Sequence, residues 1–262
     1  MRTFRYYTLG IISSILIIFS FQSCTDSTGP ENELPDPPYN HTQNPGTAAN
    51  DFLADSNFTD LVVEVDYMPG YAPNERAIDS LKAFFNQRLN KSSITIKEPT
   101  EIPSGGQDQY SANDVRNLEQ DHRSTFARGD TLAAYFVIVD GKYSERNLLG
   151  IAYYNTSNAF FGPAYDEASS GVGSPSRYQI EATSFRHEFG HLFGLVGVPG
   201  SGTEMQEPHK DPDHGNHCDD DTCLMYYATE TTDLVGNTVG SDGEIAELDA
   251  NCIADLQANG GK

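Results

Sequence analysis

The segment His187-Glu188-Phe189-Gly190-His191 has the residue types and the spacing of a metal site. On a helix, residues four apart lie one turn above each other on the same face, so His187 and His191 can offer two imidazole nitrogens to one zinc ion. Glu188 follows the first ligand and can hold a zinc-bound water and take its proton. The segment therefore predicts a zinc hydrolase site with two histidine ligands and Glu188 as general base.

The helix predicted to carry this segment has a start, an apolar face and an end. Ser176 and Gln179 fit a capping box, and Gly194 is a plausible stop. One apolar stripe follows the helical spacing: Tyr178, Ala182, Phe185, Phe189 and Leu192. A capped amphipathic helix disfavours the alternative that the two histidines are ordinary surface or capping residues.

The pattern continues downstream and resembles the metzincin metallopeptidases. Residues 187–194 fit the H-E-x-x-H-x-x-G pattern of that class, and residues 217–225 resemble the H-C-x4-C-x-M segment of archaemetzincins. The resemblance implies a zinc endopeptidase with His217 as third ligand and Met225 as an apolar floor beneath the metal. It also offers Tyr227 as a transition-state stabiliser, with packing under the site as the structural alternative.

The position of the third ligand departs from the family pattern. In metzincins the third histidine follows the glycine by three residues, and that position is Gly197 here; His217 comes 20 residues later. Residues 198–216 would then be an insertion that loops out and returns. Other third ligands stay open: His214 and His209 within the insertion, and Glu244 or Glu247 in the last helix.

Three cysteines lie in the second half of the chain. Archaemetzincins bind a second zinc with cysteines, including a later C-x-x-C pair, whereas this sequence has only Cys252 in that region. We therefore predict a disulfide between Cys218 and Cys223 that braces the loop before Met225. Cys252 is expected to be a buried free thiol, with a second metal site as the alternative.

Strands and helices alternate along the chain, which predicts an α/β fold. The apolar run 132–139 predicts a buried central strand, and 148–154 predicts a strand at an edge. The resemblance implies a metzincin- or zincin-like, mixed and mostly parallel twisted sheet with an active-site helix and a C-terminal helix. Further strands are expected at 61–65 and 93–96, and further helices from Asn74 to Leu89, at 113–123 and at 242–256; the cluster 159–162 is expected to pack in the core.

The first 24 residues predict a secretion signal that ends at a bacterial lipoprotein cleavage box, with Cys24 as the lipidated residue. Plain secretion and an uncleaved anchor stay as alternatives. Residues 25–49 are expected to be a flexible tether, and 50–262 a zinc metallopeptidase domain. Thr25 follows the lipidated cysteine, which favours the outer membrane, facing either the periplasm or the surface.

The net charge of −22, from 16 basic and 38 acidic residues, argues against nucleic acid as a partner. The charge is expected to keep an exported monomer soluble, with bound Ca²⁺ as a weaker alternative. The partners expected are a peptide or protein substrate, which would add as a strand at 148–154, and the membrane. A lipid-anchored zinc-binding protein without turnover is the alternative from another class, and a peptidase with a glutamate third ligand is the alternative within the class.

Overall fold

The computed structural model describes residues 38–197, 203–232 and 244–262, and places a six-stranded sheet and a separate two-stranded ladder among them. The sheet strands are β1 (Asp60–Tyr67), β2 (Ser93–Ile96), β3 (Thr100–Glu101), β5 (Thr131–Val139), β7 (Gly150–Tyr154) and β8 (Ser157–Phe161), and the ladder pairs β4 (Gln109–Tyr110) with β6 (Lys142–Tyr143). The α-helices are α1 (Ala49–Leu53), α2 (Glu75–Arg88), α3 (Ala112–His122), α4 (Gly162–Ser169), α5 (Arg177–Leu192) and α7 (Ala250–Ala258).

The sheet is mixed and mostly parallel, as predicted. Its strand order is β2-β1-β5-β8-β7, with β3 beside the far end of β1. Every pair is parallel except β7 with β8. The apolar strand β5 is central and buried throughout all but its first residue, and β7 is the edge strand, so both sequence predictions are confirmed. The predicted positions of β1, β2, α2 and α3 are also confirmed.

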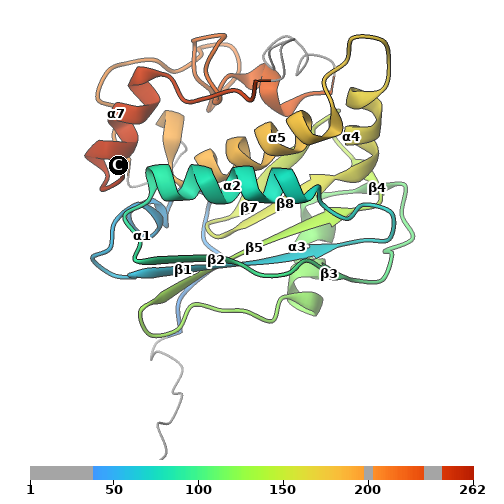
Figure 1. The fold of residues 1–262 in the computed structure, drawn as a ribbon, viewed down its shortest axis with the longest axis horizontal. Helices are drawn as coiled ribbons and strands as arrows, with labels where there is room; N and C mark the ends of the chain where they lie inside the picture. The colour runs from blue at the N-terminus through green and yellow to red at the C-terminus, as the bar shows by residue number, and fades with distance from the viewer. Residues whose placement is uncertain (1–37, 198–202, 233–243) are drawn as a thin grey trace, which may run out of the picture. The chain divides into compact units, whose positions relative to one another are not determined.

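Helices α2 and α5 lie together on one face of the sheet (Figure 1). Their aromatic residues form the centre of the core: Phe85 meets Phe189 edge to face, with ring centroids 4.8 Å apart, and Phe185 lies 4.7 Å from Phe160 and 5.2 Å from Phe136 of the sheet. Each such ring contributes about 1.5–3 kcal/mol by burial. This packing fixes α5, which carries the candidate ligands.

The start and end of α5 follow the sequence. The Ser176 side chain accepts from the backbone of Gln179, and the Gln179 side chain accepts from the backbone of Ser176, which confirms the capping box. The helix ends at Leu192, and Gly194 has a φ of 74°, a conformation that only glycine adopts without cost. The predicted stop is confirmed.

The last helix begins later than predicted. It starts at Ala250 rather than 242, because the Asp249 side chain caps it by accepting from the Cys252 N–H. The residues just before it are extended: the Leu224 N–H donates to the Glu247 carbonyl at 2.7 Å. A backbone group paired with another segment cannot also join a helix, so the helical pattern is interrupted there.

The packed part of the chain begins before the predicted domain boundary. Residues 38–49 lie on the domain: the Asn155 N–H donates to the Gln43 carbonyl at 2.9 Å, and the Tyr39 hydroxyl donates to Asp51. The predicted tether therefore does not extend to residue 49. The leader, Cys24 and residues 25–37 lie outside the described residues, and within the described ones no helix is long and apolar enough to cross a membrane.

The sequence analysis missed a strand. Residues 159–162 are buried, which confirms the predicted core packing, and they form the end of β8 and the start of α4, elements that the sequence analysis did not predict. All five residues of β8 are buried, so the strand lacks the polar and apolar alternation that marks a strand with one solvent face.

Candidate metal centres

Helix α5 places His187 and His191 one turn apart with their rings turned to the same point. His187 is buried and His191 is half-buried, and their Nε2 atoms lie 3.2 Å apart. Two imidazole nitrogens at this distance, with both lone pairs directed to one side, are an arrangement that a single ion can bridge.

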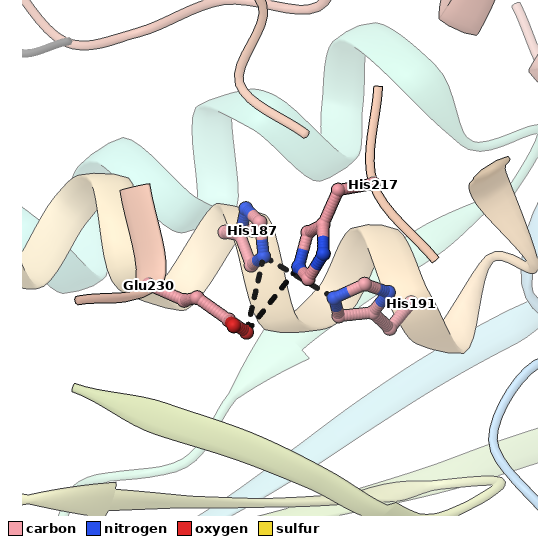
Figure 2. Close-up of side chains that lie close together, drawn as sticks. All are labelled: His187, His191, His217 and Glu230. Atoms are coloured by element: carbon pink, nitrogen blue, oxygen red, sulfur yellow. Dashed lines mark hydrogen bonds and ion pairs between the residues drawn. The ribbon is translucent and has the colours of Figure 1, made fainter. Parts of the chain in front are cut away.

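His217 completes a triangle with this pair. Its ring centroid lies 5.4 Å from that of His187 and 5.3 Å from that of His191 (Figure 2). Its Nδ1 lies 2.7 Å from the His214 carbonyl, and Nδ1 of His187 lies 2.7 Å from the Leu224 carbonyl. Because Nδ1–H donates to a carbonyl in both rings, Nε2 carries the lone pair and faces the centre.

The rival ligands lie elsewhere. His214 stacks on Tyr227 with ring centroids 3.5 Å apart, and its Nδ1 contacts Asp211. Glu247 accepts from Arg186 at 2.6 Å, while Glu244 is exposed. His209 belongs to a different cluster, described below. Of the candidates raised by the sequence, the geometry brings His217 to the helical pair.

The sequence analysis missed a fourth member, Glu230. It ends the short 3-10 helix η2 (Tyr227–Glu230), and only 8% of the residue is exposed. Its Oε2 lies 3.3 Å from His217 Nε2 and 3.9 Å from His187 Nε2. One donor atom from each of His187, His191, His217 and Glu230 lies within 4.8 Å of all the others, and we call these four residues the histidine centre.

Two buried polar atoms at the histidine centre have no hydrogen-bond partner. His217 Nε2 is buried and makes no aligned hydrogen bond, in spite of its closeness to Glu230. Oε1 of Glu188 is also buried without a partner. Buried polar atoms are normally satisfied, so these two atoms are suited to contacts with a cation and with a polar group bound to it. A donor set of three imidazoles suits zinc.

Burial keeps the helical imidazoles neutral. It lowers the pKa of His187 to about 4, with the nearby His217 adding to the effect, and it lowers the pKa of His191 well below its usual value. Burial also lowers the pKa of His217, but the Glu230 carboxylate outweighs it and the net pKa is raised. Metal ligation requires neutral rings, so the two helical ligands are prepared for an ion at neutral pH.

Glu188 lies beside a pocket of about 570 Å³. Burial raises the pKa of Glu188 well above its usual value, and the charge of Glu230 adds to the rise. The pocket is also lined by Arg146, Ile151, Ala152, His191, His217, Tyr227 and Glu230, among others. The elevated pKa matches a carboxylate that accepts and returns a proton.

Met225 lies beneath the metal-binding turn of α5. It is fully buried, and its Sδ lies 2.3 Å from where a Cβ on Gly190 would be. Only glycine allows this approach, which explains the residue between Phe189 and His191. Tyr227 lines the pocket but its ring stacks flat on His214, so the structure gives it a packing contact.

The predicted Cys218–Cys223 disulfide is absent from the structure, where both residues and Cys252 are free thiols. Instead the three converge on one point. Cys223 Sγ lies 3.6 Å from Cys252 Sγ, far beyond the length of an S–S bond. The prediction failed because it used only the two cysteines that are close in sequence, whereas α7 brings in the third.

A histidine from the insertion joins the thiols. His209 Nδ1 lies 3.3 Å from Cys218 Sγ, and its Nε2 lies 2.9 Å from the buried Asp255 carboxylate. One donor atom from each of His209, Cys218, Cys252 and Asp249 lies within 4.8 Å of all the others. Cys223 lies beside this set, with its Sγ 3.6 Å from Cys252 Sγ and 3.4 Å from Asp249 Oδ1, and we call these five residues the thiol centre. Hydrogen bonds from the two other thiols lower the pKa of Cys218, which favours the thiolate that metals bind.

No protein-family model matches the chain, and no curated protein matches it. Among solved structures, the chain is similar to the crystal structure of an archaemetzincin from Methanopyrus kandleri. The TM-score is 0.49 and the sequence identity 17%, over 78% of this chain and 96% of that one.

Proposed function

We propose that the protein is a zinc-dependent endopeptidase. The observation that carries the proposal is the histidine centre itself: three imidazole Nε2 atoms converge, and the buried carboxylate of Glu188, whose Oε1 has no hydrogen-bond partner, lies beside them at a pocket. A purely structural zinc site has no use for a base or a pocket. The resemblance of residues 187–194 and 217–225 to metzincin motifs supports the same function.

His187, His191 and His217 would hold the ion. A zinc ion held by three imidazoles lowers the pKa of water and polarises a carbonyl group. Glu188 takes the proton from the attacking water and passes it to the leaving amine. Its buried position, 1% exposed, excludes bulk water that would otherwise compete for that proton.

The substrate would bind as an extended strand beside β7. This strand is the edge of the sheet, and its residues Ile151 and Ala152 line the pocket. Main-chain donors and acceptors on an edge strand can pair with a peptide backbone, and side-chain pockets then give specificity. Ile151 and Ala152 line the same pocket as Glu188, so an added strand would place its scissile carbonyl within reach of the water that Glu188 would deprotonate.

The thiol centre would hold a second zinc ion with a structural role. Two thiols, Cys218 and Cys252, and the His209 imidazole already belong to one donor set, and Cys223 would complete a set of three thiols and one imidazole, which is a known structural zinc set. Sulfur donors on a tetrahedral zinc with S–Zn bonds of about 2.3 Å lie about 3.7 Å apart. The Cys223–Cys252 distance of 3.6 Å agrees with that value. Asp255 would orient His209, as a carboxylate partner does for many histidine ligands.

A metal-binding protein without turnover is the second candidate. Glu230 favours it, because a fourth protein donor in the histidine centre would leave no position for water. For either candidate we propose export and a lipid anchor on Cys24, with the domain in the cell envelope, on the sequence of the leader alone.

Zinc content and peptide hydrolysis test the proposal. We expect two zinc ions per purified wild-type chain and one in His217→Ala, together with hydrolysis of a quenched-fluorescence peptide library by the wild type. His214→Ala is the matched control, since that ring lies outside the donor set. Zinc that stays at two in His217→Ala would refute the ligand assignment, and a zinc-loaded protein that cleaves no peptide even with Glu230 replaced would favour the second candidate.

A further inference from the structure

The contacts of residues 229 and 230 hold Glu230 at the histidine centre. Its backbone is fixed, because the Leu149 N–H donates to its carbonyl at 2.8 Å. The preceding residue, Thr229, places its hydroxyl 2.6 Å from His187 Nδ1. The segment that carries Glu230 is therefore attached both to the edge of the sheet and to the first histidine ligand.

The distances match a four-coordinate site. Ligands about 2.0–2.1 Å from a tetrahedral zinc lie about 3.3 Å from one another. Two donor separations agree with this value, 3.2 Å for His187 with His191 and 3.3 Å for His217 with Glu230. The separation of His187 from Glu230 is longer, at 3.9 Å, and every donor pair lies within 4.8 Å. Figure 2 shows the carboxylate turned toward the same point as the rings. Glu230 thus stands at the position that a catalytic site leaves to water.

The two buried carboxylates of the site differ in this respect. Glu188 does not belong to the set of donors within 4.8 Å of one another, whereas Glu230 does. In the described part of the chain, the ion-pair partners of Glu230 are His187 and His217. A buried carboxylate whose partners are two candidate zinc ligands is well matched to the cation that those ligands bind.

We propose that Glu230 is the fourth ligand of the metal in the resting protein, so that the site is closed until this carboxylate withdraws. The inference rests on the proposed zinc site and adds a built-in latency to it. Arg146 lines the same pocket, and its charge favours the Glu230 carboxylate. It offers the carboxylate a partner when substrate takes its place in the donor set.

The test uses acetohydroxamate, a small ligand that binds zinc only where a coordination position is open. We expect wild-type protein, with both zinc ions present, to bind it weakly in isothermal titration. Glu230→Ala should keep zinc in the histidine centre and bind acetohydroxamate at least tenfold more tightly. The exposed Glu244 supplies the matched control: Glu244→Ala removes one acidic charge and should behave like the wild type.

Glu230→Asp separates ligation from charge. It keeps the negative charge on a shorter side chain, so it should bind acetohydroxamate nearly as tightly as Glu230→Ala. A gain in Glu230→Ala without a gain in Glu230→Asp would assign the effect to charge and overturn the proposal. Equal affinities in the wild type and both variants, with zinc retained, would also overturn it. Absence of zinc from the histidine centre in every protein, including the wild type, would instead refute the proposed zinc site itself.

Discussion

The two candidate metal centres share one stretch of chain but differ in what surrounds them. His217 belongs to the histidine centre and the next residue, Cys218, to the thiol centre. The histidine centre borders a pocket and has the buried Glu188 beside its donor set. The thiol centre lies between the 203–232 segment and α7; its carboxylate Asp249 belongs to the donor set, and Asp255 contacts the far nitrogen of His209.

The comparison indicates which features distinguish a candidate catalytic metal site from a candidate structural one. Donor atoms alone do not, since both centres offer four. Of the two centres, in the described part of the chain, only the histidine centre lines this pocket, and our proposed base and displaceable ligand, Glu188 and Glu230, both line it. The thiol centre instead joins the 203–232 segment to α7, so a metal there would fix the loop that positions His217.

The replacement of Glu188 should have the largest effect. Glu188→Gln keeps the shape of the side chain but cannot take a proton, so we expect peptide hydrolysis to fall about 10²–10⁴-fold. Zinc content should stay at two per chain. The rate is measured in the wild type and in a Glu230→Ala background, where the site is expected to be open. Unchanged hydrolysis would show that Glu188 takes no part in the mechanism. The two centres would then no longer differ in having a base.

The replacement of Cys252 should act on stability instead. Cys252→Ser is expected to lose the second zinc ion and lower the free energy of unfolding by on the order of 3 kcal/mol, because metal binding at a folded site contributes to folding. Chemical denaturation with zinc and with a chelator gives the measurement. With chelator the variant should match the metal-free wild type closely; a large difference there would show that the thiol acts by packing alone.

The metal-free protein should lose stability as the pH falls from about 6.5 to about 4. The pKa of His187 is about 4 in the folded state and near 6.5 when unfolded, so the unfolded state takes up the proton first. This one group removes about 3 kcal/mol across that window. Denaturation curves of wild type and His187→Asn in chelator should converge as the pH falls; parallel curves would contradict the buried neutral imidazole.

Gly190→Ala should destabilise the histidine centre by about 1–3 kcal/mol, because the new methyl group would meet Met225 Sδ. Thermal unfolding with metal present is the measurement. Met225→Ala alone leaves a cavity, but the double variant should cost less than the sum of the two single changes. Strict additivity would mean that the sulfur does not press on the helix.

His214→Ala should have the smallest effect. The ring is partly exposed and stacks on Tyr227 outside both donor sets, so zinc content should stay at two and stability should change by about 0.5 kcal/mol or less. Equilibrium dialysis against zinc measures the zinc content of the variant. A loss of one zinc ion would transfer the third-ligand role from His217 to His214.

Local sequence patterns anticipated much of the fold. The capping box at Ser176 and the glycine at 194 defined α5, and the apolar run at 132–139 defined the central strand, because each depends on contacts within a few residues. The start of α7 was wrong by eight residues, since the pairing of Glu247 with Leu224 joins segments far apart in sequence.

By itself, the sequence determined the placement of the helical pair and of Glu188, our proposed base, because the spacing of residues 187, 188 and 191 on a helix fixes their relative positions. Only the tertiary structure decided the rest. It selected His217 over His209 and His214, replaced a disulfide by a thiol centre, and brought Glu230 to the donor set. The physical reason is that these residues meet through the path of a loop and the packing of η2 and α7, and local periodicity carries no information about either.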